Sequence, residues 1–154
     1  MKVGSKVKNF KAEMTGKADF NLSDYIGKKI VIYFYPRDNT PGCTSEGEDF
    51  RDNYKLFKKM KTEIFGVSKD SLKSHEGFKE KFKFPFELIS DPDEKVCKIF
   101  DVIKEKSMYG KKYMGIERST FLIDSSGKLV QEWRKVKVTG HAKEVLEAAK
   151  KINS

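Results

Sequence analysis

The pattern of apolar and polar positions along the chain predicts short strands separated by helices. Residues 30–35 form a continuous β-branched and aromatic run, which is typical of a strand covered on both faces. Apolar runs at residues 63–68 and 86–90 predict two more strands. Those at 119–124 and 129–133 flank a turn that contains glycine, and they predict a hairpin. Phe10 and residues 20–22 indicate a short hairpin ahead of the first core strand.

Apolar residues at helical spacing predict four helices between and after these strands. From Thr44 onward, Phe50, Tyr54 and Phe57 mark one face of a helix that ends near Lys61. The same reasoning predicts helices from residue 70 or 71 to about 81, over about 92–100, and over about 140–152. Residues 104–115 show neither pattern, and we expect a loop there.

The order of these elements predicts an α/β fold in a single domain, residues 1–154. Interleaved strands and helices, followed by a strand pair and a helix, favour three layers around a mixed β-sheet flanked by helices. The thioredoxin-like fold is the simplest arrangement that ends in an antiparallel hairpin and a helix. Here it would carry an N-terminal β-hairpin extension.

Composition and charge limit the classes of function. The charged fraction is 36% and the net charge is +9, but lysine and glutamate interleave and no five like charges follow one another. This pattern favours a solvated surface, and we expect no nucleic-acid partner. No apolar run approaches the roughly 20 residues that a membrane span needs. We see no secretory segment, and two cysteines are few for a disulfide scaffold, so we expect a cytoplasmic protein.

The segment from Pro36 to Cys43 carries the clearest chemistry, because it places a thiol between a buried strand and a helix. A helix start offers free N–H groups and positive potential, which favour the thiolate, the reactive form of cysteine. Pro36 and Pro41 restrict the loop, and Gly42 permits close backbone approach. The backbone N–H groups of Gly42 and Cys43 could bind an oxygen beside the sulfur, and Thr40 adds a hydroxyl.

A reactive thiolate in such a pocket also needs a fixed positive charge. Arg118 is our first candidate because it directly precedes the apolar strand at 119–124. Arg37, in the loop itself, is the alternative. We expect Glu46 and Glu48 to interact with the helix dipole. Neither histidine pairs with a cysteine at metal-ligand spacing, so we expect no metal.

The pattern Pro36-x-x-x-Thr40-x-x-Cys43, with Arg118 on a later strand, resembles the peroxiredoxin active site. The flanking residues 33–44, 117–124 and 133–142 are similar to the peroxiredoxin Q subfamily, also called bacterioferritin comigratory protein. The resemblance covers nearly the whole chain.

This resemblance implies an antioxidant thiol peroxidase that reduces hydrogen peroxide and organic hydroperoxides. The Cys43 thiolate would attack the peroxide and become a sulfenic acid. Thr40, Arg118 and the N–H groups of Gly42 and Cys43 would hold the two oxygens, and Pro36 would shield the sulfenic acid. The resemblance implies no cofactor, a monomer, and thioredoxin, glutaredoxin or a small thiol as reductant.

The chain departs from this subfamily in its resolving cysteine. Many members carry a second cysteine five positions after the first, where this chain has Glu48, and residues 71–83 also lack one. Cys97 is the other thiol in the chain, and it has two interpretations. It is a buried structural residue of a short helix, or it resolves Cys43 after local unfolding. Our hypothesis is a one-cysteine cycle that uses an external thiol.

A second class of function stays open at this stage. The chain could be a basic, thioredoxin-fold binding module in which Cys43 is incidental. Such a module has no use for the set of Thr40, Cys43 and Arg118. Peroxide-dependent consumption of a thiol, abolished by Cys43→Ser, distinguishes the two hypotheses.

Overall fold

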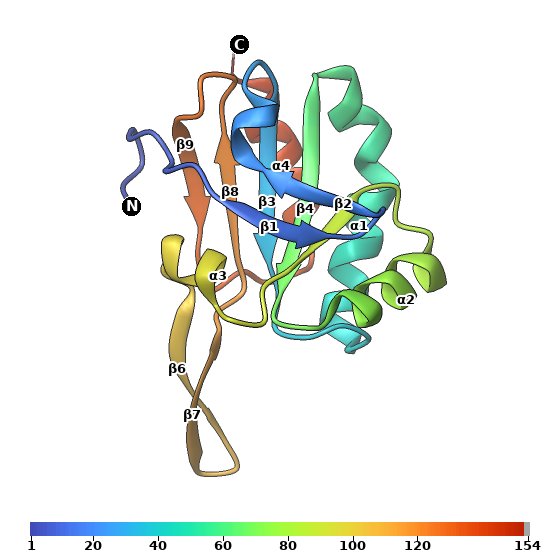
Figure 1. The fold of residues 1–154 in the computed structure, drawn as a ribbon, viewed down its shortest axis with the longest axis vertical. Helices are drawn as coiled ribbons and strands as arrows, with labels where there is room; N and C mark the ends of the chain where they lie inside the picture. The colour runs from blue at the N-terminus through green and yellow to red at the C-terminus, as the bar shows by residue number, and fades with distance from the viewer. Residues whose placement is uncertain (153–154) are drawn as a thin grey trace.

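The protein folds around a seven-stranded mixed sheet (Figure 1). The computed structural model describes residues 1–152. The strand order across the sheet is β2-β1-β5-β4-β3-β8-β9. β3 pairs in parallel with β4, and β4 with β5, whereas β8 is antiparallel to both β3 and β9. The strands of this sheet are β1 (Lys11–Met14), β2 (Ala18–Asn21), β3 (Lys29–Phe34), β4 (Thr62–Ser68), β5 (Glu87–Ser90), β8 (Ser119–Ile123) and β9 (Leu129–Trp133). The predicted mixed sheet is confirmed.

Helices and a short 3-10 segment connect these strands. The helices are α1 (Pro41–Lys59), α2 (Leu72–Phe82), α3 (Lys95–Ile99) and α4 (His141–Lys150), and the 3-10 segment is η1 (Leu22–Tyr25). All four predicted helices are present, with ends shifted by a few residues. The main shift is at the start of α1, which begins at Pro41 rather than Thr44 because proline is well suited to the first helical position.

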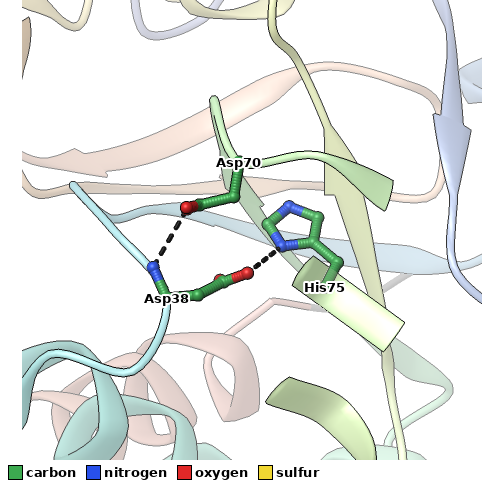
Figure 2. Close-up of side chains that lie close together, drawn as sticks. All are labelled: Asp38, Asp70 and His75. Atoms are coloured by element: carbon green, nitrogen blue, oxygen red, sulfur yellow. Dashed lines mark hydrogen bonds and ion pairs between the residues drawn. The ribbon is translucent and has the colours of Figure 1, made fainter. Parts of the chain in front are cut away.

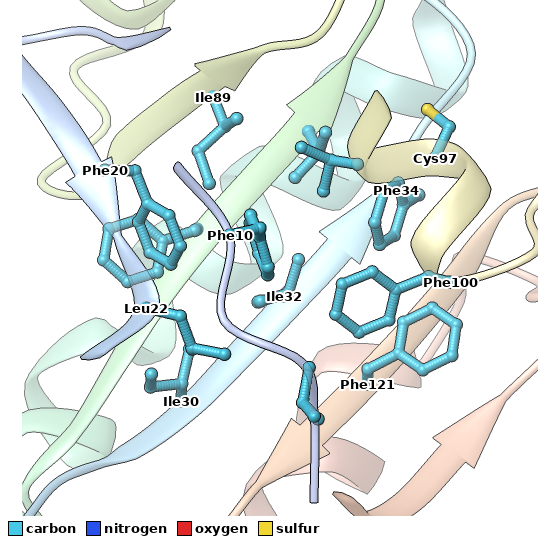
Figure 3. Packing of buried hydrophobic residues seen from close by; sticks show 14 of the residues in the cluster. Phe10, Phe20, Leu22, Ile30, Ile32, Phe34, Ile89, Cys97, Phe100 and Phe121 are labelled. Atoms are coloured by element: carbon cyan, nitrogen blue, oxygen red, sulfur yellow. The ribbon is translucent and has the colours of Figure 1, made fainter. Parts of the chain in front are cut away.

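Alternate residues of the central strands point into two separate cores. On β3, Ile30, Ile32 and Phe34 face one core, and Val31 and Tyr33 face the other. The first core also holds the N-terminal segment and α3, with a group of packed aromatic rings that includes Phe10, Phe20, Phe100 and Phe121 (Figure 3). The second core lies under α1, α2 and α4. The sheet therefore separates the side chains of α3 from those of α1.

The prediction of a loop at residues 104–115 is wrong. β6 (Ile103–Met108) and β7 (Lys111–Ile116) pair there as a separate two-stranded ribbon. Tyr109 and Gly110 both have positive φ, 52° and 78°, as a tight two-residue hairpin turn requires. The ribbon has no buried face along most of its length, so its sequence lacks the apolar alternation that marks a strand.

The two predicted hairpins are confirmed, and the N-terminal one extends the edge of the main sheet. β1 pairs with β5 through Glu13 opposite Ser90 and Met14 opposite Ile89, so the hairpin continues the main sheet. Among residues 1–152, no helix has the length and hydropathy of a membrane span.

Candidate active site

The loop between β3 and α1 leads into the helix turn that holds Cys43. Thr40 is extended and precedes the helix, Pro41 is the first helical residue, and Cys43 is the third. The sulfur thus lies within the first turn of α1, not ahead of it. The first hydrogen bond of the helix runs from the Thr44 N–H to the Thr40 carbonyl at 2.9 Å. Pro41 has no N–H, and the N–H groups of Gly42 and Cys43 have no partner within the helix. Both N–H groups are therefore available to a ligand at the positive end of the helix.

Arg118 contacts the sulfur directly. The Cys43 side chain is buried, with 1% of the residue exposed, and Arg118 Nη2 donates to its Sγ at 3.3 Å. Arg118 reaches it from the short link between β7 and β8. Arg37 is exposed on the loop, so Arg118 is the arginine that meets the thiol. A Cβ on Gly42 would lie 3.3 Å from Arg118 Nη2, so this glycine leaves room for the guanidinium.

Glu46 binds the other side of the Arg118 guanidinium. This contact was not predicted from the sequence. Arg118 Nη1 donates to Glu46 Oε1 at 2.6 Å, and Glu46 is 1% exposed. The expectation that Glu46 and Glu48 interact with the helix dipole is wrong, because α1 begins at Pro41 and has no acidic residue in its first turn. Burial raises the pKa of Glu46 to about 7, although Arg118 acts in the opposite direction. Burial also opposes the charge on Arg118, but Glu46 and Cys43 outweigh it and raise the pKa of the guanidinium.

Two polar atoms on this side of the sheet have no hydrogen-bond partner among residues 1–152. They are Glu46 Oε2 and the hydroxyl of Tyr33, both buried. Burial is the main cause that raises the pKa of Tyr33, followed by Glu46 and Cys43. The pocket around the thiol thus disfavours negative charge on Tyr33 and Glu46, and leaves Arg118 as its fixed charge.

Thr40 and Pro36 are half-buried on the loop between β3 and α1. Thr40 Oγ1 donates to the Arg37 carbonyl at 2.9 Å, so its oxygen keeps free acceptor positions. No hydrogen bond joins Thr40 Oγ1 to Cys43 within the described chain. Pro36 follows Tyr35, whose N–H donates to the Val67 carbonyl at 3.0 Å and fixes the start of the loop.

A buried ion pair fastens the same loop to α2 (Figure 2). Asp38 Oδ2 lies 2.7 Å from His75 Nδ1, and His75 Nε2 lies 2.9 Å from the Ile89 carbonyl on β5. The ring is thus held between the carboxylate of the loop and the backbone of β5. His75 is 0% exposed, and Asp38 is 5% exposed.

Further hydrogen bonds complete this network around Asp38. The Tyr35 hydroxyl donates to Asp38 Oδ1 at 2.7 Å, the Ser74 hydroxyl donates to Oδ2 at 2.8 Å, and the Asp38 N–H donates to Asp70 Oδ2 at 2.9 Å. Asp38, Asp70 and His75 bring ligand-type atoms within 4.8 Å of one another, as a metal site would. These atoms already bond each other and their neighbours. The cluster therefore fixes the position of the loop that leads to Cys43.

Cys97 lies across the sheet from Cys43. Cys97 is on α3 and 0% exposed, and its N–H donates to Asp91 Oδ2 at 2.8 Å. Burial and then Asp91 raise the pKa of its thiol, which makes it a poor nucleophile. Cys97 belongs to the first core and Cys43 to the second. A disulfide requires Cα atoms within about 7 Å, and the intervening sheet prevents this approach in the folded chain.

Comparison with known proteins identifies relatives over almost the full length. The AhpC/TSA family profile matches residues 3–132. Peroxiredoxin Bcp of Xanthomonas campestris is 55% identical over 137 residues, which are 89% of this chain and 86% of that protein. Peroxiredoxin Bcp of Bacillus subtilis is 48% identical over 153 residues, or 99% of this chain and 98% of that protein.

Solved structures agree with this result. A cysteine-to-serine mutant of Xylella fastidiosa PrxQ matches with a TM-score of 0.93 and 46% identity, and covers 97% of this chain and 96% of that one. A trapped intermediate/ligand complex of Xanthomonas campestris bacterioferritin comigratory protein, solved to explain its alkyl peroxide reduction, has a TM-score of 0.88 and 52% identity over 92% of this chain and 90% of that one. The thioredoxin-like fold predicted from the sequence is confirmed. The chain belongs to the AhpC/TSA family, as a peroxiredoxin of the peroxiredoxin Q or Bcp type.

Proposed function

We propose that Cys43 is the peroxidatic cysteine of this protein, with Arg118, Thr40, Pro36 and the N–H groups of Gly42 and Cys43 as its active site. That the chain is a thiol-dependent peroxidase follows from its membership of the peroxiredoxins. The observation that carries the assignment of residues is the contact of Arg118 Nη2 with Cys43 Sγ at 3.3 Å. The substrates we propose are hydrogen peroxide and organic hydroperoxides, in line with the alkyl peroxide reduction of the Xanthomonas relative.

The first half-reaction transfers one oxygen to the sulfur. The Cys43 thiolate attacks the terminal oxygen of a hydroperoxide, so that an S–O bond forms as the O–O bond breaks. The sulfur is oxidised to a sulfenic acid, and the other oxygen leaves as an alkoxide or hydroxide that takes a proton and becomes an alcohol or water. Arg118 and the N–H groups of Gly42 and Cys43 are placed to stabilise the charge that develops on the leaving oxygen. Thr40 Oγ1 would accept a hydrogen bond from the O–H of the peroxide and so orient the substrate.

Glu46 positions the arginine for this step. Its carboxyl binds Nη1 at 2.6 Å and leaves Nη2 directed at the sulfur. A guanidinium has donors in a fixed plane, so holding one nitrogen orients the other. Lysine has no such geometry and would not bridge the two groups.

The second half-reaction uses an external thiol in our proposal. A first thiol attacks the sulfenic acid to give a mixed disulfide and water, and a second thiol releases Cys43 with formation of the external disulfide. The position of Cys97 across the sheet, its burial and its raised pKa support a structural role for that residue. Thioredoxin, glutaredoxin or a small thiol would act as reductant. We also propose a cytoplasmic location, which fits a chain with two free cysteines, and a monomer.

The test is peroxide-dependent consumption of dithiothreitol by the purified protein. Cys43→Ser should abolish turnover, and the matched variant Cys97→Ser should retain both turnover and the rate at which Cys43 is oxidised. Activity in the Cys43→Ser variant would refute the assignment. Loss of turnover in Cys97→Ser with unchanged oxidation of Cys43 would refute the one-cysteine cycle.

The alternative of a basic binding module with an incidental Cys43 gives no role to these contacts. It does not explain why Arg118 is held between a buried thiol and a buried carboxyl. The family relationship also favours the peroxidase.

A further inference from the structure

The hairpin of β6 and β7 exposes several large apolar and aromatic side chains to solvent. It projects from the body of the protein as a narrow ribbon (Figure 1). Residues 103–116 contain four lysines and one glutamate. Tyr109 at the tip is 98% exposed, and Met108 and Tyr113, which lie on the same face of the ribbon as Lys106, are 57% and 43% exposed. Apolar and aromatic side chains gathered on an exposed ribbon mark an interaction surface.

The base of this hairpin adjoins the active site. β7 ends at Ile116, two residues before Arg118. The Glu117 N–H donates to the Val102 carbonyl at 2.7 Å and closes the base of the ribbon. Lys106 Nζ donates to the Ile116 carbonyl at 2.7 Å. In Figure 1 the hairpin leaves the same end of the molecule at which β3 ends and α1 begins.

The pKa of Lys106 also indicates that the hairpin lies close to Arg118 and Cys43. Burial, followed by repulsion from Arg118, lowers the pKa of Lys106, and Cys43 acts in the opposite direction. The lysine therefore lies within the electrostatic field of both active-site groups. A partner bound along the hairpin would stand beside Cys43.

The proposed catalytic cycle requires such a partner. The Cys43 sulfenic acid needs an external thiol, because Cys97 lies on the other side of the sheet. Cys43 is only 1% exposed, so a reductant must be held near the start of α1 while that turn opens. A surface that binds the reductant at this end raises its local concentration at the sulfur.

We propose that the hairpin of β6 and β7 is the docking surface for an acidic protein dithiol that reduces Cys43. This inference rests on the proposed function. Lys111, on the face of Met108, and Lys112 beside it attract a negatively charged partner, and Lys112 Nζ also lies 3.6 Å from the exposed Glu105 carboxylate. Tyr109, Met108 and Tyr113 supply the apolar contact that holds it.

The experiment compares two charge-reversed variants of equal net charge. Lys111→Glu/Lys112→Glu changes the hairpin, and Lys55→Glu/Lys59→Glu changes two exposed lysines on α1. Lys59 ends α1, about 24 Å along the helix from Cys43 at a rise of about 1.5 Å per residue. For each protein, kcat/KM is measured with an acidic thioredoxin and with dithiothreitol, at low and high salt. Tyr109→Ser tests the apolar contact.

We expect Lys111→Glu/Lys112→Glu to lower kcat/KM for the acidic thioredoxin at least tenfold at low salt, with less loss at high salt. Its activity with dithiothreitol should stay within twofold of the wild type, and the α1 variant should behave as the wild type with both reductants. Tyr109→Ser should lower kcat/KM for the thioredoxin about threefold at either salt concentration.

Three results would overturn the docking surface. The first is an equal loss of kcat/KM for the thioredoxin in the two charge-reversed variants, and the second is no loss in either. The third is a Lys111→Glu/Lys112→Glu variant that no longer binds anionic phospholipid vesicles but keeps unchanged thioredoxin kinetics, which would assign the hairpin to a membrane surface. A wild-type protein that reduces no peroxide even with dithiothreitol would refute the proposed function itself.

Discussion

The ion pair between Asp38 and His75 should contribute strongly to the stability of the Cys43 loop. The substitution His75→Phe keeps a ring of similar shape but removes both donors. Asp38 would then keep a buried carboxylate with the hydroxyls of Tyr35 and Ser74 as partners, and the Ile89 carbonyl would lose its donor. Removing one partner of a buried pair costs about 3–5 kcal/mol, because the other charge stays buried without compensation.

His141 provides a matched control. It is 4% exposed, its Nε2 lies 2.8 Å from the Thr120 hydroxyl, and its Nδ1 lies 3.2 Å from Oε1 of the exposed Glu144. Burial lowers the pKa of His141, so this ring is neutral at pH 7. His141→Phe therefore removes the bonds of a neutral ring to Thr120 and to the exposed Glu144 carboxylate, which together cost about 1–2 kcal/mol.

Urea unfolding at pH 7 measures both effects as changes in the free energy of unfolding. We expect His75→Phe to lose about 2 kcal/mol more than His141→Phe. In a double-mutant cycle with Asp38→Asn, the coupling to His75 should lie near the upper part of the usual range of about 0.5–3 kcal/mol. Equal losses in the two histidine variants, or additive effects in the cycle, would refute the ion pair.

Three further predictions concern the same pocket. Arg118→Lys should lower the rate of Cys43 oxidation by peroxide about 100-fold, measured by stopped-flow, because loss of one oriented donor costs about 3 kcal/mol. The pKa of Glu46 is raised from 4.5 to about 7, so its contribution to the free energy of unfolding is lost progressively as pH rises from 4.5 through 7. Relative to Glu46→Gln, the wild type should lose about 2.5 kcal/mol between pH 5 and pH 8 in urea unfolding. Gly47→Ala should destabilise by about 1–3 kcal/mol in urea unfolding, because its Cβ would collide with the buried Phe84 ring.

Most of the fold could be predicted from the sequence because its main elements carry strong periodic signals. Residues 30–35 are apolar without interruption, since β3 is buried on both faces. The ribbon of β6 and β7 could not be predicted in this way, because an exposed hairpin shows no apolar alternation. Its turn at Tyr109-Gly110 also lacks the Asn-Gly or Asp-Gly pair that marks such turns most clearly.

The candidate site was also predicted only in part from the sequence. Cys43 and Arg118 could be assigned from a local motif and a resemblance, and the structure places them in contact. Glu46 was missed because an acidic residue near a helix start has an ordinary explanation in the helix dipole. Its spacing of three residues from Cys43, one turn along the same helix face, was the available signal. His75 shares a helical face with Phe78, and a histidine on an apolar face implies a buried partner such as Asp38.

The measurement that bears most directly on the role of Cys43 is mass spectrometry of the peroxide-treated protein. The protein is treated with one equivalent of hydrogen peroxide, trapped with a reagent specific for sulfenic acid, and then denatured and alkylated. We expect the sulfenic-acid adduct on Cys43 and an alkylated, unoxidised Cys97. A disulfide between Cys43 and Cys97, or oxidation of Cys97 with Cys43 intact, would contradict a one-cysteine peroxidase whose reactive thiol is the one held by Arg118.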